Sequence, residues 1–154
     1  MIILGIDPGS TRVGYGVIEK NGGFNLIDYG VIQEKQNGDY KNIVSICDKI
    51  EKIIKKYKPV VAGLETLYFS KNKKTALSVS EARGAIILTL IKNKIGIKEF
   101  NYNDVKSVVT GSGSNDKEMV RRVVAMTLGV KKIKGYDDSA DALAIALRTA
   151  FEHN

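Results

Sequence analysis

The chain has little of several residue types, and each shortage excludes a class of protein. Its single cysteine, Cys47, excludes an internal disulfide. No stretch approaches the roughly 18 apolar residues of a membrane span, and the start lacks the charged region and the longer apolar core of a signal peptide. With only two prolines among 154 residues and 44% hydrophobic residues, the composition is that of a folded chain rather than a disordered one. We therefore expect one cytoplasmic domain, residues 1–154.

Acidic residues are also in short supply. Lysine and arginine number 24 against 17 aspartates and glutamates, which gives a formal net charge of +7. Such an excess favours an anionic partner such as nucleic acid. A lysine-rich surface that merely keeps the protein in solution explains the charge equally well, so composition alone leaves both possibilities open.

The stretch 2–6 is almost unbroken in its apolar character and stops at Asp7, which Pro8 and Gly9 follow. Such a run predicts a strand that is buried on both faces. Asp7 then lies where the sheet ends and a turn begins, which is where open α/β sheets place reactive groups. An aspartate at this place could instead do no more than cap the turn.

Hydrophobic periodicity predicts the remaining elements. We expect strands at 13–18, 24–32, 60–64 and 97–100, and helices at 39–58, 75–93, 103–109, 116–128 and from 137 onward. The first three strands form an antiparallel meander. If helix 39–58 crosses over to a strand parallel to the first, Asp7 and Glu65 emerge at the same edge of the sheet.

The helix from Asp137 is apolar nearly all round and is therefore expected to be buried. Asp137 or Asp138 can cap its start, but Asp141 lies in the second turn between alanines. Because burying an unpaired carboxylate is costly, a cation should face Asp141. Asp138 and Asp141 are three residues apart and so share one helical face.

Four carboxylates can therefore converge on one site: Asp7, Glu65, Asp138 and Asp141. Without a histidine or a suitable cysteine they are hard oxygen ligands, which suit Mg²⁺ or Mn²⁺ and disfavour zinc. Two such ions about 4 Å apart can activate a water and stabilise the leaving oxygen of a displacement at phosphorus. Joined to a basic surface, this chemistry predicts a nuclease.

Two further groups of residues are candidates for contact with nucleic acid. The stretch after Glu65 offers aromatic rings for stacking on bases and polar or charged groups for phosphates, at Tyr68, Phe69, Lys71 and Asn72. The rings could instead pack beneath their own loop. Basic residues also recur at Lys117, Arg121, Arg122, Lys131, Lys132 and Lys134. These charges are ordinary solvent-exposed side chains unless they flank the sheet edge that carries the carboxylates, where they could bind nucleic acid.

Over essentially its whole length the chain resembles the RuvC family, bacterial Holliday-junction resolvases of the ribonuclease-H-like superfamily. The resemblance rests on motifs in a specific order and spacing: Ile3-Leu4-Gly5-Ile6-Asp7-Pro8-Gly9-Ser10, Glu65 with the loop after it, Ala82-Arg83-Gly84, Val105-Lys106, Thr110-Gly111-Ser112-Gly113 and Asp138-x-x-Asp141-Ala142-Leu143-Ala144. It implies an α/β fold with a five-stranded mixed sheet, antiparallel in its first three strands and then parallel, flanked by helices.

The resemblance also implies an activity. It implies a homodimer that resolves four-way junction DNA by paired symmetric nicks, with the RuvA and RuvB branch-migration proteins as partners. Two Mg²⁺ ions per site, for which Mn²⁺ substitutes, would be held by Asp7, Glu65, Asp138 and Asp141, leaving 5′ phosphate and 3′ hydroxyl ends. Tyr68 matches the family's base-stacking aromatic, and Lys106 and Lys117 match basic residues near the scissile phosphate, so that Lys117 counts with the catalytic residues.

Three alternatives differ in the class of function. The YqgF-like branch of the same superfamily, associated with ribosomal RNA processing, shares the opening motif, but the pair Asp138 and Asp141 and the Tyr68 loop favour RuvC. Actin-like ATPases and sugar kinases share the turn after Asp7, but they need a second similar domain. A non-catalytic DNA-binding module would leave a buried Asp141 unexplained.

Overall fold

The computed structural model describes residues 1–35, 40–66, 73–111 and 116–152. Its centre is a five-stranded sheet in the order β3-β2-β1-β4-β5. The strands are β1 (Ile2–Asp7), β2 (Arg12–Lys20), β3 (Phe24–Gln33), β4 (Val61–Glu65) and β5 (Gly96–Phe100). The first three pair antiparallel, and β1, β4 and β5 run parallel. This confirms the expected mixed α/β sheet.

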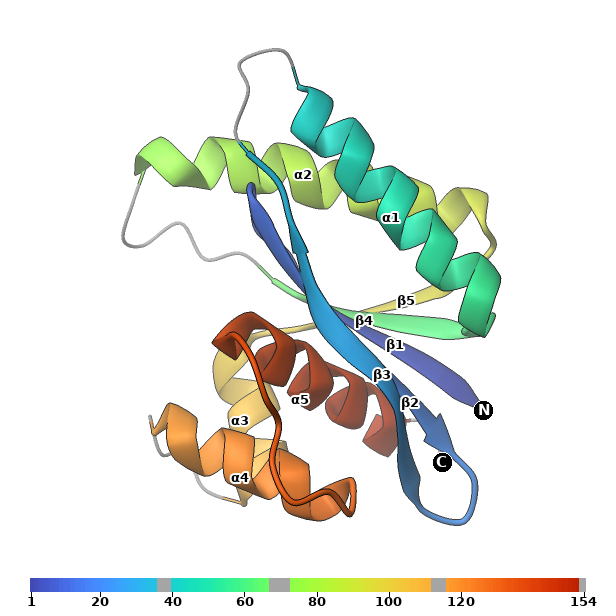
Figure 1. The fold of residues 1–154 in the computed structure, drawn as a ribbon, viewed down its shortest axis with the longest axis vertical. Helices are drawn as coiled ribbons and strands as arrows, with labels where there is room; N and C mark the ends of the chain where they lie inside the picture. Colours follow the sequence, from blue (N-terminus) through green and yellow to red (C-terminus); the bar gives the residue numbers. More distant parts are fainter. Residues whose placement is uncertain (36–39, 67–72, 112–115, 153–154) are drawn as a thin grey trace.

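Helices cover both faces of the sheet (Figure 1). One face carries α1 (Lys41–Tyr57) and α2 (Lys73–Lys92). The other carries α3 (Tyr102–Thr110), α4 (Lys117–Thr127) and α5 (Asp137–Glu152). None of the helices in the described part of the chain is long and apolar enough to cross a membrane.

Strand β1 is apolar throughout because both of its faces are buried. Ile3 belongs to the core cluster on the α5 side, while Leu4 and Ile6 belong to the cluster beneath α1 and α2. All three are fully buried. Since successive side chains of a strand point to opposite faces, a run without polar alternation is what a central strand between two helical layers requires.

Helix α5 lies directly on the sheet because glycines leave room for its backbone. A Cβ atom built at Gly5 would lie 1.9 Å from the carbonyl oxygen of Ala142, and one built at Gly14 would lie 1.9 Å from that of Asp138. No side chain larger than hydrogen fits at either place. The close approach sets the height of α5 above β1 and β2, and with it the height of Asp138 and Asp141.

The helix boundaries agree with the periodicity to within about two residues. Helix α3 starts at Tyr102 because the side chain of Asn101 accepts a hydrogen bond from the Asp104 N–H (2.7 Å). Helix α2 begins at Lys73, two residues before the expected start. The expected start of the first helix, Asp39, lies outside the described residues.

Candidate active site at the edge of the central strands

Asp7 and Glu65 emerge side by side at one edge of the sheet. The parallel register pairs Ile6 with Leu64, and each carboxylate is the next residue of its strand. The prediction that they share an edge is therefore confirmed. Apart from its electrostatic coupling to neighbouring groups, the Asp7 side chain makes no hydrogen bond to the described residues, which argues against the simple turn-capping explanation.

The turn after Asp7 is held from two sides. A Cβ atom at Gly9 would lie 2.0 Å from the carbonyl oxygen of Arg12, so the turn is too tight for a side chain there. Asn42, a buried residue of α1, donates from Nδ2 to the carbonyl oxygen of Ser10 (3.0 Å). These contacts hold the end of β1, and hence Asp7, in place.

The end of β4 is fixed by Arg83, a residue of the Ala82-Arg83-Gly84 motif on α2. Its Nε donates to the carbonyl oxygen of Glu65 (3.1 Å), and its Nη2 lies 2.8 Å from Oε1 of Glu99. The Thr66 N–H donates to the carbonyl oxygen of Phe100 (2.8 Å). The motif thus positions the backbone that carries the Glu65 carboxylate.

Burial raises the pKa of three carboxyls at this edge, those of Asp7, Glu65 and Asp141. It raises the pKa of Glu65 to about 7, with a further contribution from Asp141, against the opposing effect of Lys106 and Lys117. The pKa of Asp7 is raised well above its usual value by burial and then by its acidic neighbours, Glu65 first. The carboxylates of β1, β4 and α5 are therefore close enough for the charge of one to raise the pKa of another.

Asp141 is half-buried and is faced by cations, as the sequence predicts. Burial raises its pKa, and Lys117 and Lys106 are the positive charges that act against this rise. Burial outweighs both lysines, so the carboxyl stays harder to ionise than a free aspartic acid. A further positive charge at this place would stabilise the ionised form.

Lys117 and Lys106 reach the carboxylates from different helices. Lys117, in the first turn of α4, is exposed, and its Nζ lies 3.9 Å from a carboxylate oxygen of Asp137. Lys106, on α3, is only 5% exposed. Its Nζ lies over the ring of Tyr102, 4.0 Å from the ring centroid, which is a favourable place for an ammonium group that has lost water.

Tyr102 is the residue of this site that the sequence analysis missed. Its hydroxyl is buried beside the Asp141 carboxyl, and the hydrogen bond between them is not of ordinary geometry. Burial, followed by the charge of Asp141, raises its pKa far above the usual value. The four-residue spacing of Tyr102 and Lys106 on a helix was the signal that could have identified the pair.

Helix α3 is tied to α5 through Arg148. Its Nε donates to Oδ2 of Asp104 (3.1 Å), and its guanidinium carbon lies 4.4 Å from the ring centroid of Phe100. Because the same helix carries Tyr102 and Lys106, this tie holds both residues beside the carboxylates of α5.

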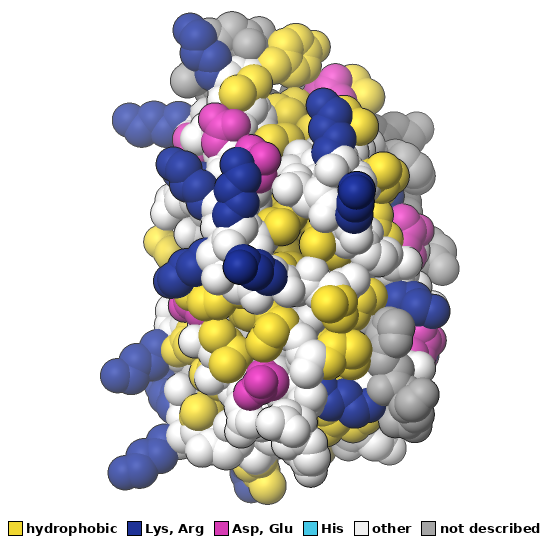
Figure 2. Space-filling view, turned by 90° about the vertical axis from the view of Figure 1, so that its right-hand side faces the viewer, with side chains coloured by type: hydrophobic (Ala, Val, Ile, Leu, Met, Phe, Trp, Pro, Cys, Tyr) yellow, Lys and Arg dark blue, Asp and Glu magenta, His cyan; other side chains and the backbone are white. Residues whose placement is uncertain are grey.

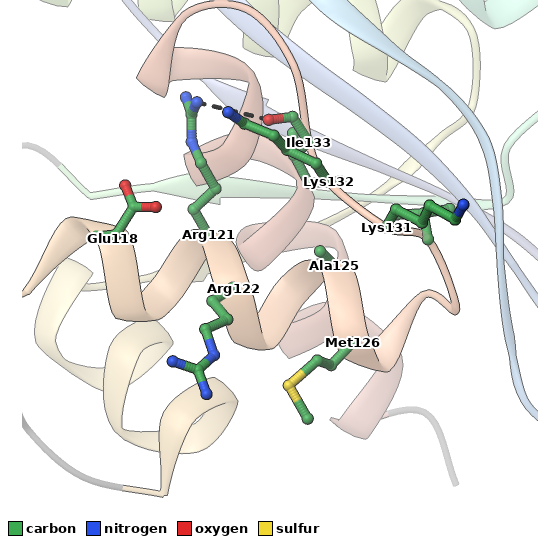
Figure 3. A pocket seen from close by; sticks show the side chains of 9 residues that line it. Glu118, Arg121, Arg122, Ala125, Met126, Lys131, Lys132 and Ile133 are labelled. Carbon is green, nitrogen blue, oxygen red and sulfur yellow. Dashed lines mark hydrogen bonds between the residues drawn. The ribbon is translucent and has the colours of Figure 1, made fainter.

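A hollow lined by basic side chains lies between α4 and the segment that follows it. We name it the α4 hollow: a space of about 440 Å³ lined by Glu118, Arg121, Arg122, Ala125, Met126, Val130, Lys131, Lys132 and Ile133. Figure 3 shows Arg121 reaching from α4 to the segment that carries Ile133. The same arginine bonds Oδ1 of Asp137 (2.9 Å), so the hollow and the start of α5 are linked.

Four candidate DNA-contact residues, Tyr68, Phe69, Lys71 and Asn72, lie outside the described residues. Their assignment stays a prediction. The last described residues before them are Glu65 and Thr66, at the edge that carries the carboxylates.

The geometry agrees with the result of comparison with known proteins. Residues 3–149 match the family described as Crossover junction endodeoxyribonuclease RuvC. The chain belongs to the RuvC family. The RuvC of Brachyspira hyodysenteriae is 47% identical over 97% of this chain and 94% of its own length, and that of Petrotoga mobilis is 46% identical over 99% and 93%.

Solved structures of RuvC proteins share the fold. The chain matches Thermus thermophilus RuvC in complex with a Holliday junction substrate with a TM-score of 0.89 and 26% identity, over 99% of this chain and 95% of the other. The match covers the sheet and both helical layers. The RuvC family therefore accounts for the fold of almost the entire chain.

The RuvC nucleases are metal-dependent, and the donor set of this chain fits a divalent cation. Its carboxylates are hard oxygen donors, and the raised pKa values of Asp7, Glu65 and Asp141 reflect buried negative charge that a cation would stabilise. As they stand, no three acidic, histidine or cysteine side chains of the described residues are close enough together to hold an ion. The fit therefore lies in the chemistry of the donor groups and in their raised pKa values.

Proposed function

We propose that this RuvC-family chain resolves four-way DNA junctions by metal-dependent hydrolysis of two symmetrically placed phosphodiesters. The observation that carries the proposal is the group of half-buried carboxyls with raised pKa, Asp7, Glu65 and Asp141, beside two lysines at one sheet edge. Such a group is unfavourable unless a cation joins it. Carboxyls that serve only to stabilise the fold would not be grouped in this way, whereas a metal-dependent phosphodiesterase needs such a group to bind its cation.

In this proposal Asp7, Glu65, Asp138 and Asp141 hold two Mg²⁺ ions, and Mn²⁺ can replace them. Bound at this edge, the ions would supply activation of the attacking water and stabilisation of the leaving oxygen. Burial and the charges of Glu65, Asp141 and Asp138 all raise the pKa of Asp7, so a bound cation would stabilise its ionised form. Arg83 and the tight turn at Gly9 keep the two strand ends from moving apart.

The lysines orient the substrate. Lys117 is exposed at the mouth of the site and can contact a non-bridging oxygen of the scissile phosphate. Lys106 is almost fully buried, and its charge limits the mutual repulsion of the carboxylates. The oxygen of water bonds to phosphorus as the bond from phosphorus to the 3′ oxygen breaks. The water releases one proton to solvent, and the 3′ oxygen takes up one proton. The products are a 5′ phosphate and a 3′ hydroxyl.

The proposed enzyme is a homodimer of one-domain chains in the cytoplasm, since paired nicks require two sites. Helix α2 offers a face for the second copy: Leu77, Leu88 and Ile91 are 67%, 52% and 59% exposed. Gly84, on the same helix, meets no heavy atom within 4 Å where a Cβ would be, so a second backbone can approach. RuvA and RuvB remain the partners that the family resemblance predicts.

The direct test offers labelled four-way junction, linear duplex and structured RNA to the protein, with Mg²⁺ and with a chelator. Paired nicks in the junction alone, lost on chelation, are expected. Cleavage confined to RNA would favour the YqgF-like alternative. Metal-independent binding without any cleavage would favour a DNA-binding module, and either result would refute the proposal.

The role of Asp7 is tested by Asp7→Asn, which keeps the side-chain volume and removes a charged oxygen donor. We expect cleavage to fall by at least about 1000-fold, the scale on which essential catalytic groups act, while junction affinity changes little. Asp48→Asn, on the exposed surface of α1, is the matched control. Near-normal cleavage by Asp7→Asn would show that the site is misassigned.

A further inference from the structure

The α4 hollow carries positive charge that the described part of the chain does not neutralise. Arg122, Lys131 and Lys132 are exposed and make no hydrogen bond or ion pair with the described residues. Glu118 is the single acidic residue of the lining. Holding these like charges around one hollow is unfavourable, and an anion seated there would relieve the repulsion.

The hollow is a fixed feature of the fold rather than a set of loose side chains. Arg121 donates to the carbonyl oxygen of Gly135 (3.1 Å) as well as to Asp137, which clamps the segment after α4 against the helix. Ile133, within that segment, is fully buried. The Lys134 N–H donates to the hydroxyl of Tyr29 on β3 (3.1 Å). Lys131 and Lys132 therefore project from an anchored backbone.

The lining combines charge with apolar surface. In Figure 3 Arg121, Lys131 and Lys132 lie on the side of α4 toward which Ala125 points, while Arg122 and Met126 extend from the other side. Met126 is 70% exposed. A phosphodiester backbone presents the matching chemistry, because its phosphates are anionic and its sugars are largely apolar.

The position relative to the carboxylates selects the source of the anion. Lys117 faces the carboxylates, and Arg122 follows it by five residues on α4, which is about 7.5 Å along the helix axis. Successive phosphates of one strand are about 3.4 Å apart along a duplex axis. Lys117 and Arg121 both contact Asp137, at 3.9 and 2.9 Å, so the hollow adjoins the lysine that faces the carboxylates. A strand that runs along α4 from Lys117 would meet the hollow about two nucleotides away.

We propose that the α4 hollow binds the sugar-phosphate backbone of the DNA arm that carries the scissile strand. This inference rests on the proposed junction cleavage. Its effect would be to hold the arm as it leaves the catalytic edge, with Arg122, Lys131 and Lys132 contacting phosphates and Arg121 maintaining the shape of the hollow. An acidic protein segment is the competing occupant, and the experiment distinguishes the two.

The test compares Lys131→Gln/Lys132→Gln with Lys52→Gln/Lys55→Gln, which removes the same charge from α1 on the opposite face of the sheet. Junction affinity is measured with a chelator present, across a series of salt concentrations. The hollow variant should bind about 10-fold more weakly than the control, and its slope of log affinity against log salt should be shallower by about 1 to 2, as expected when one or two phosphate contacts are lost.

A second measurement locates the contacts on the DNA. Replacing the phosphates two to four nucleotides from the cleavage position by uncharged methylphosphonates should weaken binding of the control variant and leave that of the hollow variant unchanged. Equal affinities and equal salt slopes for both variants would overturn the inference. Failure of the unmodified protein to cleave junctions would instead refute the proposed function, so the two failures are distinguishable.

Discussion

At the scale of single residues, Tyr102 explains how Lys106 can be buried beside the carboxylates. Lys106 is almost fully buried, a state that is rare for lysine unless the ammonium group is paired. The ring of Tyr102 supplies part of the compensation by a cation–π contact, which is worth about 2 kcal/mol where water is excluded. The ring of Tyr102 and its hydroxyl therefore have separable roles.

Substitutions at Tyr102 test this separation. Tyr102→Leu should lower the rate of junction cleavage about 10-fold, since the ammonium group of Lys106 loses its ring, whereas Tyr102→Phe should stay within about threefold of the unmodified protein. Because the buried hydroxyl makes no hydrogen bond of ordinary geometry, although Asp141 lies beside it, Tyr102→Phe should also raise the free energy of unfolding by about 1 kcal/mol. Single-turnover cleavage and urea unfolding check the two effects.

The exposed Tyr40 provides the control, since Tyr40→Phe should change neither quantity. Equal cleavage rates for Tyr102→Leu and Tyr102→Phe would show that the ring does not position Lys106.

At the scale of elements, the contact between α5 and the sheet sets the geometry of the site. Asp138 and Asp141 have no flexible loop to bring them to the strand ends, because they belong to a helix that is buried over most of its length. Their distance from Asp7 depends on how closely that helix approaches β1 and β2. The glycines of those strands set the approach.

Gly14→Ala tests this dependence. The new methyl group would overlap the carbonyl oxygen of Asp138, so α5 has to move away from β2. We expect a loss of about 3 kcal/mol in the free energy of unfolding, the scale of overpacking in a core, together with a lower cleavage rate in the protein that still folds. Denaturant unfolding and cleavage at saturating Mg²⁺ measure the two.

Gly23→Ala is the matched control, because a Cβ atom at Gly23 meets no heavy atom within 4 Å. Its stability should stay within about 0.5 kcal/mol of that of the unmodified protein, as for most surface substitutions. If Gly14→Ala were equally harmless, the glycine contact would not set the position of α5.

At the scale of the whole molecule, charge is unevenly arranged. Basic side chains outnumber acidic ones on the face shown in Figure 2, while buried acids gather at one edge of the sheet. The basic exterior attracts DNA, and the acidic interior requires a cation. Folding stability should therefore depend on pH and on divalent metal.

Burial raises the pKa of Glu65 from 4.5 to about 7. Between these values the folded state binds more protons than the unfolded state, so the free energy of unfolding falls as pH rises through this window. The metal-free protein should thus be less stable at pH 8 than at pH 5, on the order of 2 kcal/mol after allowance for the partial exposure of the group.

Urea unfolding with a chelator at the two pH values measures this difference. Adding Mg²⁺ at pH 8 should restore stability, by about 2.7 kcal/mol when its concentration is 100 times its dissociation constant. Glu65→Gln should flatten the pH dependence. A metal-free protein that gains stability between pH 5 and pH 8 would contradict the assignment of buried, mutually repelling carboxyls.

Assembly is the second property of the whole molecule. Leu88→Glu places a charge on the exposed apolar face of α2 without disturbing the core, since Leu88 is 52% exposed. If that face joins two copies, the variant should be monomeric by sedimentation, and paired nicks should become single ones. Val60→Glu, at another exposed apolar position, is the control. A Leu88→Glu protein that stays dimeric would place the interface elsewhere.

Local patterns in the sequence determined most of the architecture. The apolar run 2–6 predicted a strand with both faces buried, and the spacing of apolar residues predicted each helix to within about two residues. These features depend on neighbours within a turn of helix or along one strand, so they can be inferred before the fold is known. The candidate ligands Asp7, Glu65, Asp138 and Asp141 followed from the same patterns, because each ends or interrupts an apolar run.

Only the tertiary structure decided what surrounds those ligands. The contact of Arg83 with Glu65, the glycines beneath α5 and the clamp of Arg121 join residues that are distant in the sequence, and no periodicity encodes them. The same is true of the charge that Tyr102 and Lys106 share with the carboxylates, since it depends on how α3 packs against α5. Burial sets the pKa of each acid, and burial is a property of the packed molecule, whereas the sequence determines only which acids are present.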